Sequence, residues 1–121
     1  MSNEVVAILE DVFMTTKIRE VATKQEQDVR FVRDLIGWDK RLAGPSPNLV
    51  LVDLTAESLK PMKLIQRVKA QTEWSGARVV AYASHSRAEL MEEANRAGAD
   101  SVLAKSDVAA RLNEILQGAG Q

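Results

Sequence analysis

The sequence predicts an α/β fold with a single doubly wound parallel sheet of five strands and five helices, formed by one domain over residues 1–121. Short apolar runs alternate along the chain with segments whose apolar residues recur at helical spacing. Strands that are joined through helices run parallel, and their crossovers are almost always right-handed. The central run, Asn48–Leu54, is apolar from Leu49 until it reaches Asp53, which is typical of a strand buried on both faces of such a sheet.

Two strand and helix pairs precede the central strand. The first strand covers Val5–Leu9 and ends on two acids, and the second covers Asp28–Val32, whose polar neighbours are typical of an edge strand. Each is followed by a helical pattern. The stripe of the first helix contains Met14, Ile18 and Val21, and that of the second contains Leu35, Ile36, Trp38 and Leu42. Gly37 lowers the helix propensity of the second segment by about 1 kcal/mol relative to alanine, and the turn Gly44–Pro47 ends it.

Three helices and two strands follow the central strand. The strands are expected at Ala77–Ala83 and Ser101–Lys105. The helical stripes contain Leu64, Ile65 and Val68, then Leu90, Met91 and Ala94, then Val108, Leu112 and Ile115. Pro61 is compatible with the first turn of its helix. The spacing of Ser86 and Glu89 predicts a capping box, Gly98 a carboxyl cap, and Gln117–Gln121 a loose tail.

Composition excludes several function classes. The formal net charge is -1 with acids and bases interspersed, so we expect neither direct nucleic-acid binding nor membrane binding. The chain has no cysteine, which excludes disulfides, thiolate metal sites and cysteine nucleophiles and fits a reducing compartment. No signal-peptide pattern or membrane-spanning run is found, and we expect a cytoplasmic location.

Charged residues follow three of the strands. Glu10 and Asp11 follow the first strand, Asp53 ends the third, and Lys105 ends the fifth. The carboxyl ends of parallel strands meet at one edge, where ligands bind in such sheets. Clustered carboxylates favour a hard divalent cation such as Mg²⁺, and a lysine beside them favours an anion. This pattern predicts that Asp53 acts as a nucleophile toward a phosphoryl donor.

On these residues the chain resembles the receiver domains of two-component response regulators, of the stand-alone chemotaxis-regulator type. Glu10 and Asp11 stand at the family's acidic pair, Asp53 at its phosphoacceptor and Lys105 at its invariant lysine. The resemblance covers nearly the whole chain. It implies the flavodoxin-like strand order 2-1-3-4-5 and a histidine kinase or phosphotransfer protein as partner.

The resemblance also implies a role for individual residues. Asp11 and Asp53 would ligate Mg²⁺ directly, the backbone carbonyl of Thr55 would be a third ligand, and Glu10 would act through water. Lys105 would pair with the phosphoryl group, and the backbone N–H groups of Thr55 and Ser84 would donate to it.

Other positions depart from the family pattern. Ala83 stands where the family has a hydroxyl residue that contacts the phosphoryl group, and Val102 stands where it has a switching tyrosine or phenylalanine. The Ser84 hydroxyl would replace the missing group only if the strand has already ended and the loop turns it back. Ser106 replaces the proline after the invariant lysine. Our hypothesis is therefore that the site is chemically competent while its output is rewired or absent. Coupled movement of the fourth and fifth strands on phosphorylation would contradict it.

Two other functional hypotheses stay open beside the phosphorylated receiver. One is a pseudo-receiver, a protein-interaction module that docks or dimerises through the face of helix 4, strand 5 and helix 5, with the charged cluster serving as a structural ion pair. The other is a small flavodoxin-like enzyme or nucleotide binder, which the lack of a glycine-rich phosphate loop disfavours. We expect no enzymatic activity, output through a downstream protein partner, and a monomer or weak homodimer.

Four side chains are interpreted as ordinary structural residues. Trp38 and Trp74 are expected to be partly buried. Two interpretations stay open for Tyr82, a ring presented at the edge of the fourth strand near the usual output face or a half-buried strand aromatic. His85 is expected to be a solvated loop residue, although the resemblance places it, with Thr55, at positions that tune the lifetime of a phosphoryl-aspartate.

Overall fold

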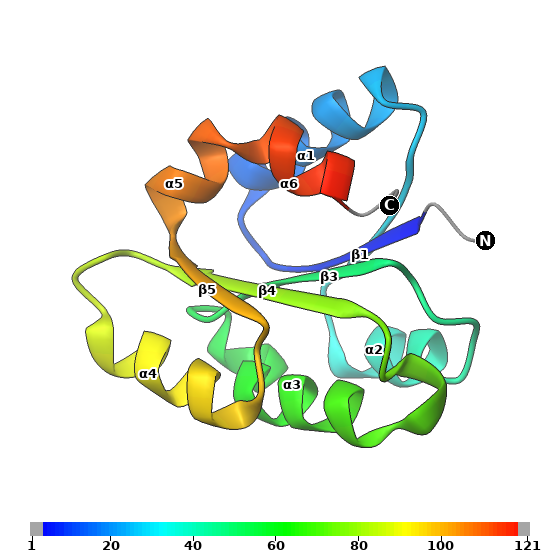
Figure 1. The fold of residues 1–121 in the computed structure, drawn as a ribbon, viewed down its shortest axis with the longest axis vertical. Helices are drawn as coiled ribbons and strands as arrows, with labels where there is room; N and C mark the ends of the chain where they lie inside the picture. Colours follow the sequence, from blue (N-terminus) through cyan, green and yellow to red (C-terminus); the bar gives the residue numbers. More distant parts are fainter. Residues whose placement is uncertain (1–3, 119–121) are drawn as a thin grey trace.

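The computed structural model describes residues 4–118 and contains one sheet of five parallel strands in the order β2-β1-β3-β4-β5 (Figure 1). The strands are β1 (Glu4–Ile8), β2 (Asp28–Val32), β3 (Leu49–Asp53), β4 (Arg78–Ala83) and β5 (Ser101–Ala104). The doubly wound sheet and its strand order are therefore confirmed, and β2 is an edge strand as its sequence predicts.

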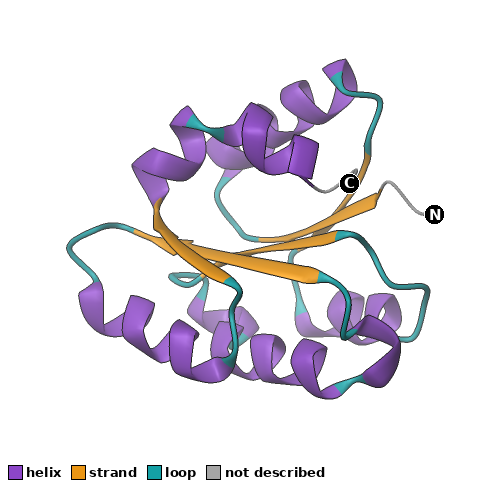
Figure 2. Ribbon diagram, viewed as in Figure 1, coloured by secondary structure: helices purple, strands orange, loops and turns teal. Residues whose placement is uncertain are grey.

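Helices cover both faces of the sheet, which forms the middle layer in Figure 2. They are α1 (Val12–Lys24), α2 (Leu35–Leu42), α3 (Pro61–Ala70), α4 (Ala88–Ala97), α5 (Lys105–Ala110) and α6 (Leu112–Gly118), with short 3-10 turns η1 (Glu57–Leu59) and η2 (Thr72–Trp74). Helices α1, α5 and α6 lie on one face and α2, α3 and α4 on the other (Figure 1). The expected fifth helix is divided in two at Arg111. Of the expected loose tail, Gln117 and Gly118 belong to α6, and residues 119–121 lie outside the described residues.

The two faces of the sheet have separate apolar cores. Strand β3 is buried along its whole length and alternates between them, because successive strand side chains point to opposite faces. Val50 and Val52 pack in the core under α2, α3 and α4. Leu49 and Leu51 pack in the core under α1, α5 and α6. Asp53, the last residue of β3, is thus held by a strand anchored on both sides.

Helix boundaries confirm some sequence signals and correct others. Pro61 occupies the first turn of α3, and Gly98 caps α4 with a φ of 114°. The capping box at Ser86 and Glu89 is wrong. The α4 N-cap is Arg87, whose side chain pairs with Glu89, while the Ser86 hydroxyl bonds to that of Ser84 at 3.0 Å.

The expected stripe of α2 is only half correct. Trp38 and Leu42 are buried, but Leu35 and Ile36 are 38% and 71% exposed. This helix lies beside the edge strand, where the sheet ends, so only one narrow side of it meets the core.

The large aromatic side chains are more buried than expected. Trp38 and Trp74 are 0% exposed and pack edge to face with ring centres 5.7 Å apart. The side chain of Tyr82 is also buried, with 1% of its surface exposed. These rings belong to the cores because they lie between helices and sheet, and partial burial was therefore the wrong expectation for all three. Within residues 4–118, no helix is long and apolar enough to cross a membrane.

Candidate functional site

Asp53 lies at the carboxyl end of β3 and is only 6% exposed. Its Oδ1 accepts hydrogen bonds from the backbone N–H of Thr55 at 2.9 Å and from the Thr55 hydroxyl at 2.7 Å. Among residues 4–118, Oδ2 of Asp53 accepts no hydrogen bond. The carboxylate is therefore held by one oxygen, while the other oxygen has no donor in the described part of the chain.

Asp11 connects two elements at the same edge. It is the N-cap of α1, and its Oδ1 accepts from the backbone N–H groups of Phe13 at 2.9 Å and Met14 at 3.2 Å. Its Oδ2 accepts a hydrogen bond from the Lys105 ammonium at the start of α5. This bond, together with the N-cap bonds, lowers the pKa of Asp11 below its ordinary value. The structure thus brings Asp11 and Lys105 into direct contact.

Glu10 reaches across the same edge to the segment after β3. Its side chain is exposed, and its Oε1 accepts a hydrogen bond from the Ser58 hydroxyl at 3.0 Å. Glu10 therefore ties the loop after β1 to η1. The carboxylates of Glu10, Asp11 and Asp53 lie on neighbouring strand ends, yet each is engaged by a different partner.

The donor atoms suit a hard cation, but their arrangement does not form a ready metal centre. Carboxylate and carbonyl oxygens are the ligands that Mg²⁺ takes in proteins. Within residues 4–118, no three acidic or histidine side chains gather in a way that holds a metal ion. The Lys105 ammonium already occupies the free oxygen of Asp11. A cation at this edge would have to compete with that lysine.

Tyr82 is buried beside the two aspartates. It pairs with Asp53 in the register of β3 and β4, so the two side chains lie on the same face of the sheet. Its hydroxyl is buried and has no hydrogen-bond partner among the described residues. Burial, followed by the negative charges of Asp53 and Asp11, raises the pKa of Tyr82 far above its ordinary value. The negative charges of both aspartates therefore add to the effect of burial on the Tyr82 hydroxyl.

The remaining sequence-predicted positions offer no further side-chain donor to Asp53. Strand β4 ends at Ala83, which is 1% exposed, and Ser84 follows it in the loop. The Ser84 hydroxyl bonds to Ser86 and not to Asp53. Val102 is half-buried against the core under α4, and His85 is exposed.

Sequence reasoning missed two contacts of this edge. The Thr55 hydroxyl was not expected on Asp53, and Ser58 was not expected on Glu10. The N-cap role of Asp11 was also missed, although an aspartate directly before a helical pattern is a known start signal.

Comparison with solved structures shows what the fold is. The chemotaxis response regulator CheY4 of Vibrio cholerae superposes with a TM-score of 0.82 over 98% of this chain and 99% of that chain, at 13% identity. The chain has the fold of a response-regulator receiver domain. The receiver fold is also found in the phosphorylated cyanobacterial phytochrome response regulator RcpA, with a TM-score of 0.78 over 98% of this chain and 91% of that chain, at 17% identity.

A third receiver-fold match is to part of a larger protein. NtrX from Brucella abortus matches with a TM-score of 0.78 and 19% identity over 99% of this chain, which spans only 28% of that NtrX chain. No protein-family model and no curated protein matches the chain. The similarity is therefore one of structure, carried by the sheet order and the helices around it.

Proposed function

We propose that this protein is a signalling receiver of a two-component phosphorelay, which accepts a phosphoryl group on Asp53. The observation that carries the proposal is the state of the Asp53 carboxylate. Oδ1 is fixed by two donors from Thr55, and Oδ2 has no donor among residues 4–118. A carboxylate held in this way presents one oriented oxygen as a nucleophile.

The proposed step is a phosphoryl transfer. An oxygen of Asp53 attacks phosphorus, and the bond between phosphorus and the donor breaks, leaving its electron pair on the donor, which takes up a proton. The product is an acyl phosphate on Asp53. Lys105 is close enough to the acidic edge to contact Asp11. We infer that Lys105 exchanges this contact for an oxygen of the phosphoryl group, whose charge it would neutralise.

The same proposal assigns the groups around Asp53. Asp11, Asp53 and the backbone carbonyl of Thr55 would hold Mg²⁺, with Glu10 acting through water. The ion would neutralise the phosphoryl oxygens when bound. The backbone N–H of Ser84 would donate to the phosphoryl group. The supporting observation is that β1, β3, β4 and β5 all deliver these groups to one edge of the sheet.

The partners follow from the proposed chemistry. A histidine kinase or phosphotransfer protein would supply the phosphoryl group, and a downstream protein would read the face of α4, β5 and α5. The RcpA structure with the receiver fold is described as phosphorylated, which supports this role for the fold. We place the protein in the cytoplasm, as a monomer or weak homodimer without direct binding of nucleic acid.

A second candidate is a pseudo-receiver that binds partners without phosphorylation. Three observations favour it. Lys105 occupies an oxygen of Asp11 that a cation would need. The described residues also contain no group of three acidic or histidine side chains that could hold a metal ion. Ala83 and Val102 also remove the side chains that would transmit a change at Asp53.

Intact-mass spectrometry tests the two candidates. We expect one phosphoryl adduct after incubation with acetyl phosphate and Mg²⁺. The adduct should be absent from Asp53→Asn and retained by Asp39→Asn, because Asp39 is an exposed aspartate on α2 whose one ion pair among the described residues is with Arg67. A folded protein without an adduct would support the pseudo-receiver instead.

The output hypothesis needs a separate readout on the phosphorylated protein. Amide chemical shifts should change around Asp53, Thr55 and Ser84, without coupled changes along β4 and β5. Shifts that propagate together through β4 and β5 would contradict a missing switch, since Ala83 and Val102 carry no hydroxyl or aromatic ring.

A further inference from the structure

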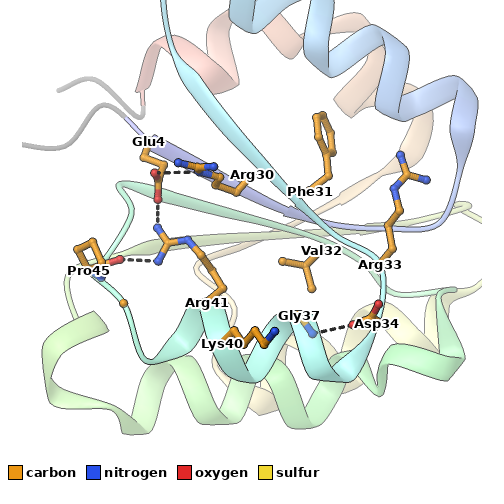
Figure 3. A pocket seen from close by; sticks show the side chains of 11 residues that line it. Glu4, Arg30, Phe31, Val32, Arg33, Asp34, Gly37, Lys40, Arg41 and Pro45 are labelled. Atoms are coloured by element: carbon orange, nitrogen blue, oxygen red, sulfur yellow. Dashed lines mark hydrogen bonds and ion pairs between the residues drawn. The ribbon is translucent and has the colours of Figure 1, made fainter.

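A groove runs along the open edge of the sheet (Figure 3), and Asp53 is not among the residues that line it. One wall is formed by residues 30–34 of β2 and the loop after it, and the other by Gly37, Lys40 and Arg41 of α2 and by Gly44 in the turn after that helix. These α2 residues share one helix face, because they are spaced by three or four residues. The volume is about 610 Å³, within the range of about 300–1,000 Å³ that is common for binding sites. We call this hollow the β2 groove.

The β2 groove is lined by an excess of positive charge. Among the described residues, four cations line it, Arg30, Arg33, Lys40 and Arg41, against two carboxylates, Glu4 and Asp34. The whole chain has a formal net charge of -1, so this excess is local. Both carboxylates are already engaged inside the protein. Glu4 pairs with Arg41 and Arg30, and Asp34 caps α2 through Gly37 N–H at 2.6 Å.

Three of the four cations remain available to a partner. Arg41 is fixed, since it pairs with Glu4, donates to the Pro45 carbonyl at 2.7 Å and lies 5.2 Å from the Trp74 ring centre. Arg30 makes only a long contact of 3.7 Å to Glu4 and its side chain is 68% exposed. Arg33 and Lys40 are exposed and form no ion pair within residues 4–118.

The backbone of β2 adds a second feature to this groove. Within residues 4–118, strand β2 pairs only with β1, so one of its edges has no strand neighbour in this part of the chain. The Val32 carbonyl accepts from Leu9 N–H at 3.4 Å and therefore points toward β1. Because backbone groups alternate along a strand, the N–H and C=O groups of Val29 and Phe31 point outward. In Figure 3 the Val32 side chain points toward α2 and Phe31 points away from it.

We propose that the β2 groove binds an extended acidic segment of a partner protein, which pairs with the free edge of β2. The five residues of β2 span about 16 Å, a length that suits an extended peptide rather than a compact anion. Backbone hydrogen bonds from Val29 and Phe31 supply affinity, and Arg30, Arg33 and Lys40 select acidic side chains. This surface lies outside the proposed phosphorylation site and does not depend on it.

Chemical-shift mapping on the isotope-labelled protein tests the proposal. The probe is a blocked peptide of alternating glutamate and valine, used at low ionic strength because salt screens exposed charges. We expect amide shifts at Val29, Phe31 and Arg33 and along α2. The Asp53→Asn protein should bind equally well, which separates this result from any failure of phosphorylation.

Matched variants and peptides give the test its controls. Arg30→Glu with Lys40→Glu should weaken binding about tenfold, the effect of removing two exposed ion pairs and adding repulsion. Lys63→Glu with Arg96→Glu makes the same charge change at exposed cations of α3 and α4 that have no ion pair in the described chain, and should bind as the parent does. A peptide of lysine and valine should not bind.

Three results would overturn the proposal. An N-methylated glutamate and valine peptide that binds as well as the parent peptide would show that charge alone acts, without strand pairing. A single-stranded oligonucleotide that binds the β2 groove more tightly than the acidic peptide would assign the surface to nucleic acid. Absence of shifts at Val29 and Phe31 would exclude binding at this edge.

Discussion

The contact between Asp11 and Lys105 sets the resting state of the acidic edge. Lys105 has a proposed role toward a phosphoryl group and Asp11 toward a cation. In this structure the two side chains instead form an ion pair with each other. The Lys105 hydrogen bond lowers the pKa of Asp11, so Asp11 is ionised and bound over the whole neutral range. Any ligand at this edge must therefore compete with an internal ion pair.

This pair predicts a specific pH dependence of stability. A carboxyl whose pKa is lowered by folding stabilises the folded state above its unfolded pKa, near 3.8, and loses that contribution as pH falls through the folded pKa. Lys105→Met should therefore lower the free energy of unfolding by about 0.5 kcal/mol at pH 7, a value reduced by solvent screening. The difference should vanish in acid, as measured by urea unfolding.

Lys63→Met is the control for this measurement, because Lys63 is exposed and has no ion pair among the described residues. It should match the parent at every pH. A Lys105→Met deficit of the same size in acid and at neutral pH would contradict a role for Asp11 ionisation and point to lost packing of the lysine stem.

The end of helix α4 depends on one backbone conformation. Gly98 caps it with a φ of 114°, and its N–H bonds to the carbonyl of Asn95. A Cβ on Gly98 would lie 3.2 Å from Cγ of Lys69, on the neighbouring α3. Both the left-handed conformation and this close approach favour glycine at the position.

Gly98→Ala and Gly76→Ala form a matched pair that tests this cap. Gly98→Ala should lower the free energy of unfolding by about 1–2 kcal/mol, the usual cost of a side chain in left-handed backbone. Gly76→Ala should be neutral or slightly stabilising, because a Cβ there meets nothing within 4 Å. Thermal unfolding measures both. Equal effects of the two substitutions would mean that the α4 cap carries no backbone strain.

The boundaries and burial of the helices and strands show which sequence signals predict the structure correctly. The bounds of β2 are predicted to the residue and those of the other strands to within one residue. In β1, β3 and β4 the signal is a short continuous apolar run, which is typical of a strand buried on both faces of a parallel sheet. The α2 stripe failed at Leu35 and Ile36, since a helical pattern does not reveal that the sheet ends beneath that helix. The capping box failed because Glu89 had a nearer partner in Arg87.

For the molecule as a whole, sequence could predict the charged edge but not the β2 groove. Asp11, Asp53 and Lys105 lie at or just after the carboxyl ends of strands. A parallel sheet brings these ends to one edge, independent of the conformation of the loops. The β2 groove combines Glu4, β2 and one face of α2, which no local pattern connects. A formal net charge of -1 also conceals a local excess of cations.

The ionisation of buried Tyr82 limits the stability of the fold at alkaline pH. It is the only tyrosine of the chain, and its ionisation in the folded state would place a third negative charge beside Asp53 and Asp11. Because folding raises its pKa above the ordinary value of 10.0, its contribution to stability is complete below pH 10 and declines above it. Tyrosinate absorbance should thus rise only together with loss of circular dichroism. A tyrosinate signal from folded protein would contradict this coupling between Tyr82 ionisation and unfolding. If the coupling holds, the absorbance of Tyr82 alone reports the global unfolding of the protein at alkaline pH.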